Sequence, residues 1–156
     1  MDTATFIALA MACAPQVHIE TAQALVRVES GFNPWAIGIV GGALTRQPQR
    51  QDEALATARS LQASHWNFSV GLAQINAKNF ARLGLTLSSA MEPCENLRAM
   101  QAVLIECAER AAPEVQVTDQ VTLRRALSCY YSGNFSTGFS HGYVRRVARA
   151  MPGAPP

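Results

Sequence analysis

The longest uninterrupted pattern in the sequence is helical, and it lies at residues 95–111. Apolar side chains recur there every three or four residues, at Leu97, Met100, Leu104 and Ala108. This spacing places them on one face of an α-helix and leaves the charged face to solvent. Such a helix must pack its apolar face against other elements, so the rest of the chain is expected to supply further helices.

Six further segments carry helical signals. The expected helices cover residues 5–12, 20–30, 52–62, 77–84, 118–130 and 141–150, with Thr118 or Asp119 capping the fifth. The glycine-rich segment 36–50 predicts a hairpin or an extended loop, and residues 65–70 predict a polar-aromatic loop. The predicted fold is therefore mainly α (α+β), a bundle of about six to eight helices with a small β-hairpin or loop insertion.

The composition is that of one globular domain. Of 156 residues, 49% are hydrophobic and 15% are charged, enough to bury a sizeable core. We expect the domain to cover residues 1–150 and a Pro-rich linker or tail to begin at 151–156. The early apolar run, 5–14, is too short to span a bilayer and lacks the basic residues of a signal peptide. It is expected to be a core helix, not a transmembrane segment.

Neither a nucleic acid nor a metal ion is expected as a ligand. A net charge of +2 is too small for a typical nucleic-acid protein. The histidines are His18, His65 and His141, and their contexts lack ligand spacing, so no metal or cofactor is expected. Arg145, Arg146 and Arg149 form a basic helix face, either simply solvated or a contact for an anionic polymer or partner.

The cysteines predict disulfides. They are Cys13, Cys94, Cys107 and Cys129. Because no C-x-x-C pair occurs, a zinc site or a thioredoxin-like motif is disfavoured. Two disulfides formed in an oxidising compartment are the preferred interpretation, and buried free thiols are the alternative. Four cysteines allow three connectivities, and the sequence does not choose among them.

Glu29 is the first candidate for chemistry. It ends a predicted helix among apolar residues (Leu25, Val26 and Val28), just before a helix-stopping glycine. A carboxyl group in apolar surroundings resists losing its proton, which suits a general acid. The alternative is an ion pair with Arg27 or with the basic helix at 141–150. We predict that Glu29 is a general acid that helps to cut glycosidic bonds.

Two other segments mix polar and apolar residues in a way that packing alone does not explain. Residues 71–76 read Gly-Leu-Ala-Gln-Ile-Asn, and residues 130–134 read Tyr-Tyr-Ser-Gly-Asn. Amide and phenol groups that converge with one carboxyl group suit a sugar-binding cleft. The plainer alternatives are that Asn76 caps a helix and that Tyr130 and Tyr131 are core aromatics.

In this order, the segments resemble lytic transglycosylases with the goose-type lysozyme-like fold, in particular those of type IV secretion systems. The shared pattern is Glu-Ser-Gly-Phe-Asn-Pro at 29–34, Gly-Leu-x-Gln-Ile-Asn at 71–76 and the Tyr-containing Ser-Gly-Asn turn at 130–134. Three shorter matches are Cys13-Ala14-Pro15, Arg46-Gln47-Pro48 and Pro93-Cys94-x-Asn96-Leu97. The resemblance covers about residues 10–140 and implies that the β insertion lies beside a substrate cleft.

The resemblance assigns roles residue by residue. Glu29 matches the catalytic acid, Ser30 the hydroxyl that accompanies it, and Tyr130 the tyrosine whose hydroxyl lies near the acid. The substrate-binding candidates are Ser30, Gly71, Leu72, Gln74, Ile75, Asn76, Tyr130 and Tyr131. Two positions depart from the family. Ala73 replaces a common methionine, and Tyr131 replaces an asparagine whose contact must be lost or remade.

The resemblance also implies a reaction, cleavage of the MurNAc–GlcNAc β-1,4 bond of peptidoglycan to give 1,6-anhydro-muramyl products. Glu29 would serve as both acid and base, because the other candidate carboxyl groups occupy helix starts, where acidic residues are common. Those candidates are Asp52, Glu53, Glu92 and Glu95. The implied enzyme is a periplasmic monomer without a cofactor that opens the wall for secretion-system components. A hydrolytic muramidase and a non-catalytic peptidoglycan-binding assembly factor are the alternatives.

Overall fold

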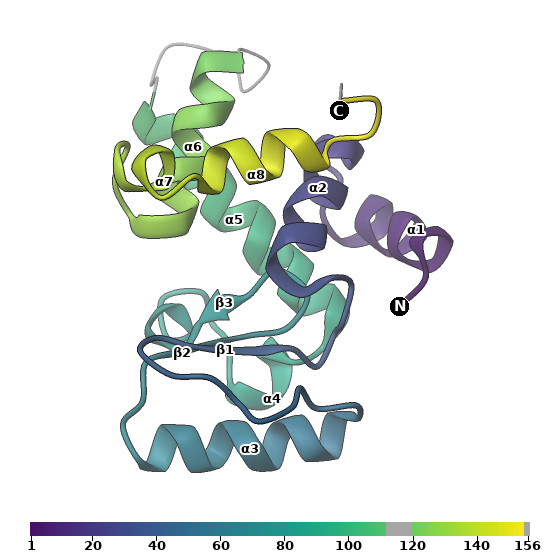
Figure 1. Ribbon diagram of the computed structural model, residues 1–156. Coiled ribbons are helices and arrows are strands. Elements are labelled where there is room, and N and C mark those ends of the chain that lie inside the picture. Colours follow the sequence, from purple (N-terminus) through teal and green to yellow (C-terminus); the bar gives the residue numbers. More distant parts are fainter. Residues whose placement is uncertain (112–119, 155–156) are drawn as a thin grey trace.

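The computed structural model describes residues 1–111 and 120–154 (Figure 1). The helices there are α1 (Thr3–Cys13), α2 (Ile19–Ser30), α3 (Gln51–Ala63), α4 (Leu87–Ala90), α5 (Pro93–Ala111), α6 (Gln120–Ser132), α7 (Thr137–Ser140) and α8 (Tyr143–Ala150). The strands are β1 (Ile37–Ile39), β2 (Phe68–Val70) and β3 (Ile75–Asn76), with the 3₁₀ turn η1 (Ala77–Asn79) after β3. The predicted mainly α fold with a small β insertion is confirmed.

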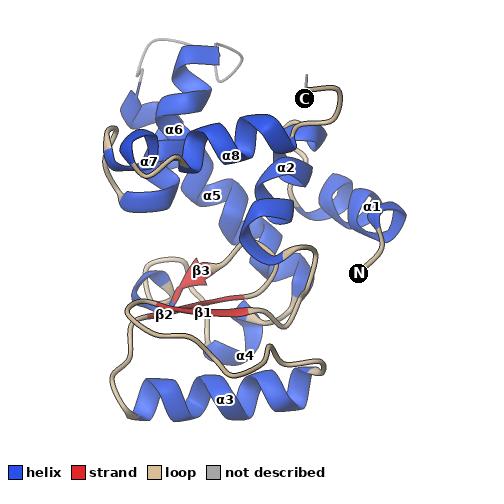
Figure 2. Ribbon diagram, in the orientation of Figure 1, coloured by secondary structure: helices blue, strands red, loops and turns tan. Residues whose placement is uncertain are grey.

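The molecule has a helical part and a smaller part that contains the sheet. Figure 2 shows the three strands with α3 and α4 on one side and most of the remaining helices gathered on the other. Helix α5 reaches from one part to the other and packs against α4, α1 and α6. The short sheet is thereby held against the end of the helical part.

One main core joins the helices to the sheet. Its members include Phe6, Leu25, Val26, Val70, Leu72, Leu97, Met100, Leu127, Tyr143 and Val147. The predicted stripe of α5 is buried along its whole length, from Leu97 to Ala108. Removing these apolar side chains from water stabilises the fold by about 25 cal/mol for each Å² of buried apolar surface.

The end of α2 is set by Gly31, as predicted. This residue adopts the left-handed conformation, with φ of 58°, and its N–H group bonds the Arg27 carbonyl. Glycine enters that region without the steric cost that a Cβ atom brings. The chain therefore turns directly after Glu29 and passes into β1.

The sheet is where the sequence-based prediction fails most. Segment 36–50 contains β1, but β1 pairs antiparallel with β2 rather than folding into a hairpin of its own. Residues 68–70, expected to be loop, form the central strand. Phe68 and Val70 are buried on either side of Ser69, yet three residues are too few to show a clear alternation. The outer edge of β1 is covered by the Gln47 side chain, which bonds both the N–H and the carbonyl of Ile37.

The remaining differences concern short helices and helix ends. The four-residue helices α4 and α7 were not predicted, and the helix expected at 77–84 is reduced to η1 followed by turns. The last helix begins at Tyr143 rather than 141, because Gly142 before it is left-handed, with φ of 72°. The caps predicted at Thr118 or Asp119 lie outside the described residues.

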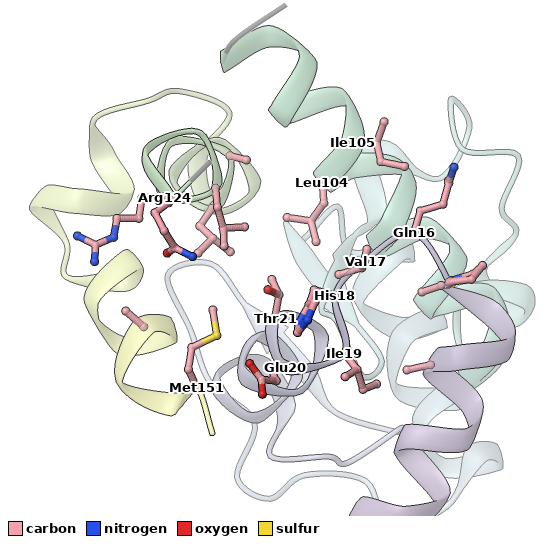
Figure 3. A pocket seen from close by; sticks show the side chains of 18 of the residues that line it. Gln16, Val17, His18, Ile19, Glu20, Thr21, Leu104, Ile105, Arg124 and Met151 are labelled. Carbon is pink, nitrogen blue, oxygen red and sulfur yellow. The ribbon is translucent and has the colours of Figure 1, made fainter. Parts of the chain in front are cut away.

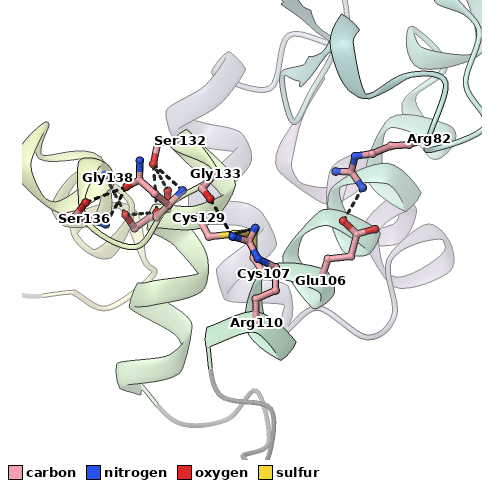
Figure 4. Close-up of a disulfide and its surroundings, with 11 residues drawn as sticks. Arg82, Glu106, Cys107, Arg110, Cys129, Ser132, Gly133, Ser136 and Gly138 are labelled. Atoms are coloured by element: carbon pink, nitrogen blue, oxygen red, sulfur yellow. Dashed lines mark hydrogen bonds and ion pairs between the residues drawn. A yellow bond between two sulfur atoms is a disulfide. The ribbon is translucent and has the colours of Figure 1, made fainter.

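All four cysteines form disulfides, as preferred from the sequence, and the structure selects one of the three connectivities. Cys13 bonds Cys94 and ties α1 to the start of α5. Cys107 bonds Cys129 and ties the end of α5 to α6 (Figure 4). Arg110 lies beside the second bridge and donates to Cys129 Sγ. This bridge therefore holds the part of α6 that continues into Tyr130 and Tyr131.

Candidate active site

Glu29 lies in the last turn of α2, which packs against α8. The same helix end is anchored by Leu25 and Val26, both fully buried. The Tyr143 hydroxyl, at the start of α8, donates a hydrogen bond of 2.5 Å to Glu29 Oε1. Part of the Glu29 side chain remains exposed, so the residue is not sealed from solvent.

The environment of Glu29 holds its proton. Burial raises the pKa of this carboxyl group from its ordinary value of 4.5 to about 7. The Tyr143 hydrogen bond and the positive charge of Arg146 act in the opposite direction, lowering the pKa, but burial outweighs them. A group with a pKa near 7 can give up a proton and recover it at neutral pH, as acid–base catalysis requires.

In the part of the chain that the structure describes, Glu29 does not form the ion pair that was its alternative interpretation. Among the described residues, Glu29 takes part in none of the four ion pairs. The Arg27 guanidinium lies 5.7 Å from the centre of the Phe32 ring instead. The last helix supplies Tyr143 as a hydrogen-bond donor and Arg146 as a nearby charge.

The other candidate carboxyl groups lie in different environments. Glu53 and Glu95 pair with neighbouring arginines, Arg46 and Arg98. Asp52 and Glu92 are exposed. Compared with these four, Glu29 alone is both half-buried and outside the ion pairs of the described residues.

Tyr130 is close enough for the charge of Glu29 to affect its pKa, but its hydroxyl does not bond Glu29. It donates a 2.6 Å hydrogen bond to the Ala73 carbonyl. Burial, and then the charge of Glu29, raise the pKa of Tyr130 well above its ordinary value, so it remains a neutral donor. The hydroxyl bonded to the acid is that of Tyr143, which was not among the predicted site residues. The available signal was a tyrosine on the apolar side of a basic helix, where a buried hydroxyl needs a partner.

The 71–76 turn is held by a buried amide that the site prediction also missed. Asn96 Oδ1 accepts the Ala73 N–H at 2.8 Å, and Asn96 Nδ2 donates to the Val70 and Ala90 carbonyls at 2.9 and 2.8 Å. Gly71 packs so tightly on it that a Cβ atom there would lie 2.2 Å from Asn96 Nδ2. The residue was visible in the sequence only as part of the match at 93–97.

The two amides of the turn have internal hydrogen bonds. Gln74, with a positive φ of 50°, donates through Nε2 to the Ala36 and Gly71 carbonyls, both at 3.0 Å. It therefore ties the turn to the start of β1. Asn76 accepts the Lys78 N–H at 3.0 Å and caps η1, which confirms the capping alternative for this residue.

The other substrate-binding candidates divide into buried and exposed ones. Leu72 and Ile75 lie in the core, and the Ser30 hydroxyl donates to the Val26 carbonyl of its own helix. Tyr131 is 41% exposed and stacks on Tyr143, with ring centres 4.6 Å apart. Glu29, Tyr143, Tyr130 and Tyr131 thus gather in one place, whereas the apolar members of the turn are buried in the core.

A cavity of about 1060 Å³ lies apart from this cluster (Figure 3). Its lining is mostly apolar and includes Val17, Ile19, Thr21, Leu104, Ile105, Leu123, Arg124 and Met151. Glu29, Tyr130 and Tyr143 do not line it. The cavity is therefore separate from the candidate acid.

In residues 1–111 and 120–154, no three His, Cys, Asp or Glu side chains gather in a way that would hold a metal ion. None of the helices described there combines the length and apolar character needed to cross a bilayer.

Comparison with known proteins gives three relatives of interest. The chain is 49% identical over 147 residues to the type IV secretion system protein virB1 of Brucella abortus. This match covers 91% of this chain and 62% of the relative. It is 40% identical over 152 residues to the virB1 proteins of Rhizobium radiobacter and Agrobacterium fabrum, covering 96% of this chain. The chain thus spans about three fifths of the length of these curated relatives. No solved structure matches it significantly.

A family model also matches most of the chain. The model described as the transglycosylase SLT domain matches residues 6–149, from the first helix to the last. That span contains Glu29, the 71–76 turn and all three tyrosines of the cluster. The chain belongs to the transglycosylase SLT domain family.

Proposed function

We propose that this domain is a peptidoglycan lytic transglycosylase that cleaves the MurNAc–GlcNAc β-1,4 bond and leaves a 1,6-anhydro-muramyl end. The observation that carries the proposal is Glu29, a half-buried residue whose carboxyl group has a pKa of about 7 in a member of this family. No second carboxyl group of the described residues shares its environment. Both proton transfers are therefore assigned to Glu29.

In the first step, protonated Glu29 donates its proton to the glycosidic oxygen. The bond between muramyl C1 and that oxygen breaks, and the GlcNAc part leaves as an alcohol. The substrate's own acetamido group stabilises the positive charge that develops at C1. Glu29 is left as a carboxylate, a state that Tyr143 and the charge of Arg146 favour.

In the second step, the Glu29 carboxylate removes the proton from the muramyl C6 hydroxyl. Oxygen O6 then forms a bond to C1 and closes the 1,6-anhydro ring. The proton returns to Glu29, so the residue is ready for the next cycle and no water is consumed. A carboxyl group that must act as acid and then base works best with a pKa near the working pH.

The neighbouring residues keep this carboxyl group in place. Tyr143 fixes one carboxyl oxygen, and its own pKa is raised well above the ordinary value by burial and by Glu29. Tyr130 joins α6 to the 71–76 turn through the Ala73 carbonyl. We assign Ser30, Gln74, Asn76, Tyr130 and Tyr131 to the substrate-binding surface around Glu29, while the buried Leu72 and Ile75 hold the 71–76 turn in the core.

The setting of the reaction is proposed from the relatives and the disulfides. The three relatives reported above are virB1 proteins, and the one from Brucella abortus is called a type IV secretion system protein. Two disulfides suit an oxidising compartment such as the periplasm. We therefore place the enzyme in the periplasm as a monomer that opens the cell wall locally for a secretion apparatus.

The test is the product spectrum from purified peptidoglycan, with wild type beside Glu29→Gln. Wild type is expected to release 1,6-anhydro-muropeptides, and Glu29→Gln to release none while melting as a folded protein. Glu20→Gln is the matched control, because Glu20 is an exposed glutamate on the same helix.

Two results would replace the proposal with its alternatives. Products heavier by one water would mean a hydrolytic muramidase with the same acid. Binding of peptidoglycan without any soluble product would mean an assembly factor without activity. Full activity of Glu29→Gln would remove Glu29 from the acid role.

A further inference from the structure

Three exposed side chains surround Tyr143, the residue bonded to Glu29. Tyr131 stacks on the Tyr143 ring with an angle of 19° between the planes. His141 bonds the Tyr131 hydroxyl through Nδ1 at 3.1 Å. The Arg146 guanidinium lies 5.9 Å from the centre of the Tyr143 ring and donates through Nη1 to the His141 carbonyl at 3.0 Å. These contacts hold Arg146 at the edge of the candidate site.

Arg146 has donors to spare. Its guanidinium group carries five N–H bonds, and one hydrogen bond is recorded for it among the described residues. It also takes part in none of the four ion pairs in that part of the chain. Yet its charge is close enough to Glu29 to lower the pKa of that carboxyl group. An exposed cation beside the acid is therefore open to an anion from outside.

The surrounding charge favours an anion as well. Residues 120–156 contain five arginines and no aspartate or glutamate, which gives them a net charge of +5. The whole chain carries +2, so residues 1–119 carry −3. The positive charge is thus concentrated in the last quarter of the chain, which supplies Tyr130, Tyr131 and Tyr143. Such a concentration attracts anionic groups to this side of the site.

We propose that Arg146 binds a carboxylate of the peptide attached to the muramyl sugar whose bond is cut. The assignment rests on the proposed function. The N-acetylated sugars of the glycan are neutral, so the peptide supplies the carboxylates of a strand. Glu29 must reach both the glycosidic oxygen and the C6 hydroxyl of the muramyl ring, and the peptide hangs from C3 of the same ring. Arg146 is the nearby cation that this anion can reach.

The geometry suits arginine rather than a generic positive charge. A guanidinium group offers two parallel N–H donors that match the two oxygens of a carboxylate. Because the Tyr143 ring and the His141 carbonyl already hold Arg146, less side-chain freedom is lost when the ligand binds. Arg146 is thus a specificity-determining residue for strands that carry peptides.

The test compares two soluble substrates that differ only in the charge of the peptide. One is uncrosslinked glycan with its peptides, and the other is the same glycan after the peptide carboxylates have been converted to neutral amides. The measured quantity is the ratio of the two KM values, at pH 6, where Glu29 is protonated in every variant. General damage to the site affects both substrates and cancels in the ratio. Arg146→Gln is expected to reduce the preference for strands with free peptide carboxylates about tenfold.

The controls separate charge from contact. Arg149→Gln removes the same charge from the same helix, and no contact of Arg149 with Tyr143 or Glu29 is recorded in the described residues, so its preference should match wild type. Arg146→Lys keeps the charge but loses the paired donors, and is expected to fall between wild type and Arg146→Gln. An unchanged KM ratio in Arg146→Gln, or an equal change in Arg149→Gln, would overturn the assignment.

A binding measurement makes the inference independent of turnover. In the Glu29→Gln background, titration calorimetry with the same two substrates should show the same loss of preference when Arg146→Gln is added. If wild type cleaves neither substrate, the proposed transglycosylase activity fails, while this titration still decides the role of Arg146. If the titration shows equal affinity for both substrates in both proteins, the carboxylate contact does not exist.

Discussion

The Tyr143 hydroxyl lies 2.5 Å from Glu29 Oε1 and joins two residues that are 114 positions apart in the sequence. The bond stabilises the charged carboxylate, so it lowers the pKa of Glu29 against the larger effect of burial. The pKa of Tyr143 is itself raised well above its ordinary value, so the phenol stays a donor throughout the neutral range. Tyr143 therefore helps to set the pH at which Glu29 changes its charge.

The first prediction follows for Tyr143→Phe. Loss of the hydrogen bond should raise the pKa of Glu29 further above 7 and free the carboxyl group to rotate. The falling limb of kcat/KM, which reports loss of the proton from Glu29, should move to higher pH, and kcat should fall about tenfold. A pH–rate profile on soluble peptidoglycan measures both. A limb at the wild-type position would show that Tyr143 does not act through the Glu29 proton.

The second prediction concerns stability and pH. The folded protein holds the Glu29 proton up to about pH 7, whereas the unfolded chain loses it near 4.5. Between these values the folded state binds more protons, so Glu29 makes folding less favourable as pH rises, by about 3 kcal/mol in full above pH 7. Glu29→Gln should remove this cost. Urea unfolding should find the variant more stable than wild type at pH 8, with the gain vanishing at pH 4.

The control for that measurement is Glu20→Gln, an exposed change on the same helix. It should leave the difference in unfolding free energy between pH 4 and pH 8 as in wild type. A stability gain of Glu29→Gln that is equal at both pH values would mean that the carboxyl group does not carry a raised pKa.

Some features could be predicted from the sequence because they are local. The stripe of α5 repeats at helical spacing, and Gly31 stands where a helix ends, so both follow from neighbouring residues. The apolar neighbours of Glu29 belong to the same helix, which is why its burial was visible. Information of this kind extends over one or two helical turns, and it was enough to fix the fold class.

Other features depend on contacts that no local pattern records. The bond from Tyr143 to Glu29 is made when α8 packs against α2, and no pattern around Tyr143 points to Glu29. Strand β2 is three residues long and is a strand because it pairs with β1 and β3. The choice among three disulfide connectivities likewise required the positions of four segments in space. Long-range packing, rather than propensity, decided each of these.

The third prediction concerns Asn96→Ala. The change removes three hydrogen bonds and leaves the Ala73 N–H and the Val70 carbonyl in the interior without this partner. Each unsatisfied buried group costs about 1–3 kcal/mol, so the loss of stability should reach about 3–5 kcal/mol in total. Urea unfolding measures it. Asn79→Ala is the control, because Asn79 accepts one bond from Arg82 on the surface, and it should cost less than about 1 kcal/mol.

The fourth prediction uses the contact between Gly71 and Asn96. In Gly71→Ala the new methyl group would meet Asn96 Nδ2 at 2.2 Å, and the backbone φ of +82° strains any residue other than glycine. We expect a loss of about 2–4 kcal/mol. Adding Asn96→Ala should relieve the clash but not the strain. The double variant should therefore lose less stability than the sum of the losses of the two single variants. Strict additivity would show that the two side chains do not compete for the same space.

The last prediction separates the two disulfides. Cys13 and Cys94 enclose a loop of 81 residues, and Cys107 and Cys129 one of 22. In the loop-closure model, removal of each pair as a double serine variant costs about 4.5 and about 3 kcal/mol respectively. Activity should follow the opposite order. Cys129 precedes Tyr130, and Arg110 links the same bridge to the Gly133 carbonyl that ends α6 (Figure 4), so loss of this bridge loosens the candidate site itself. Unfolding in urea and muropeptide release, measured on both variants at a temperature where both are folded, should therefore rank them differently. The same ranking in both measurements would mean that the bridge at Cys107 stabilises the fold without positioning Tyr130.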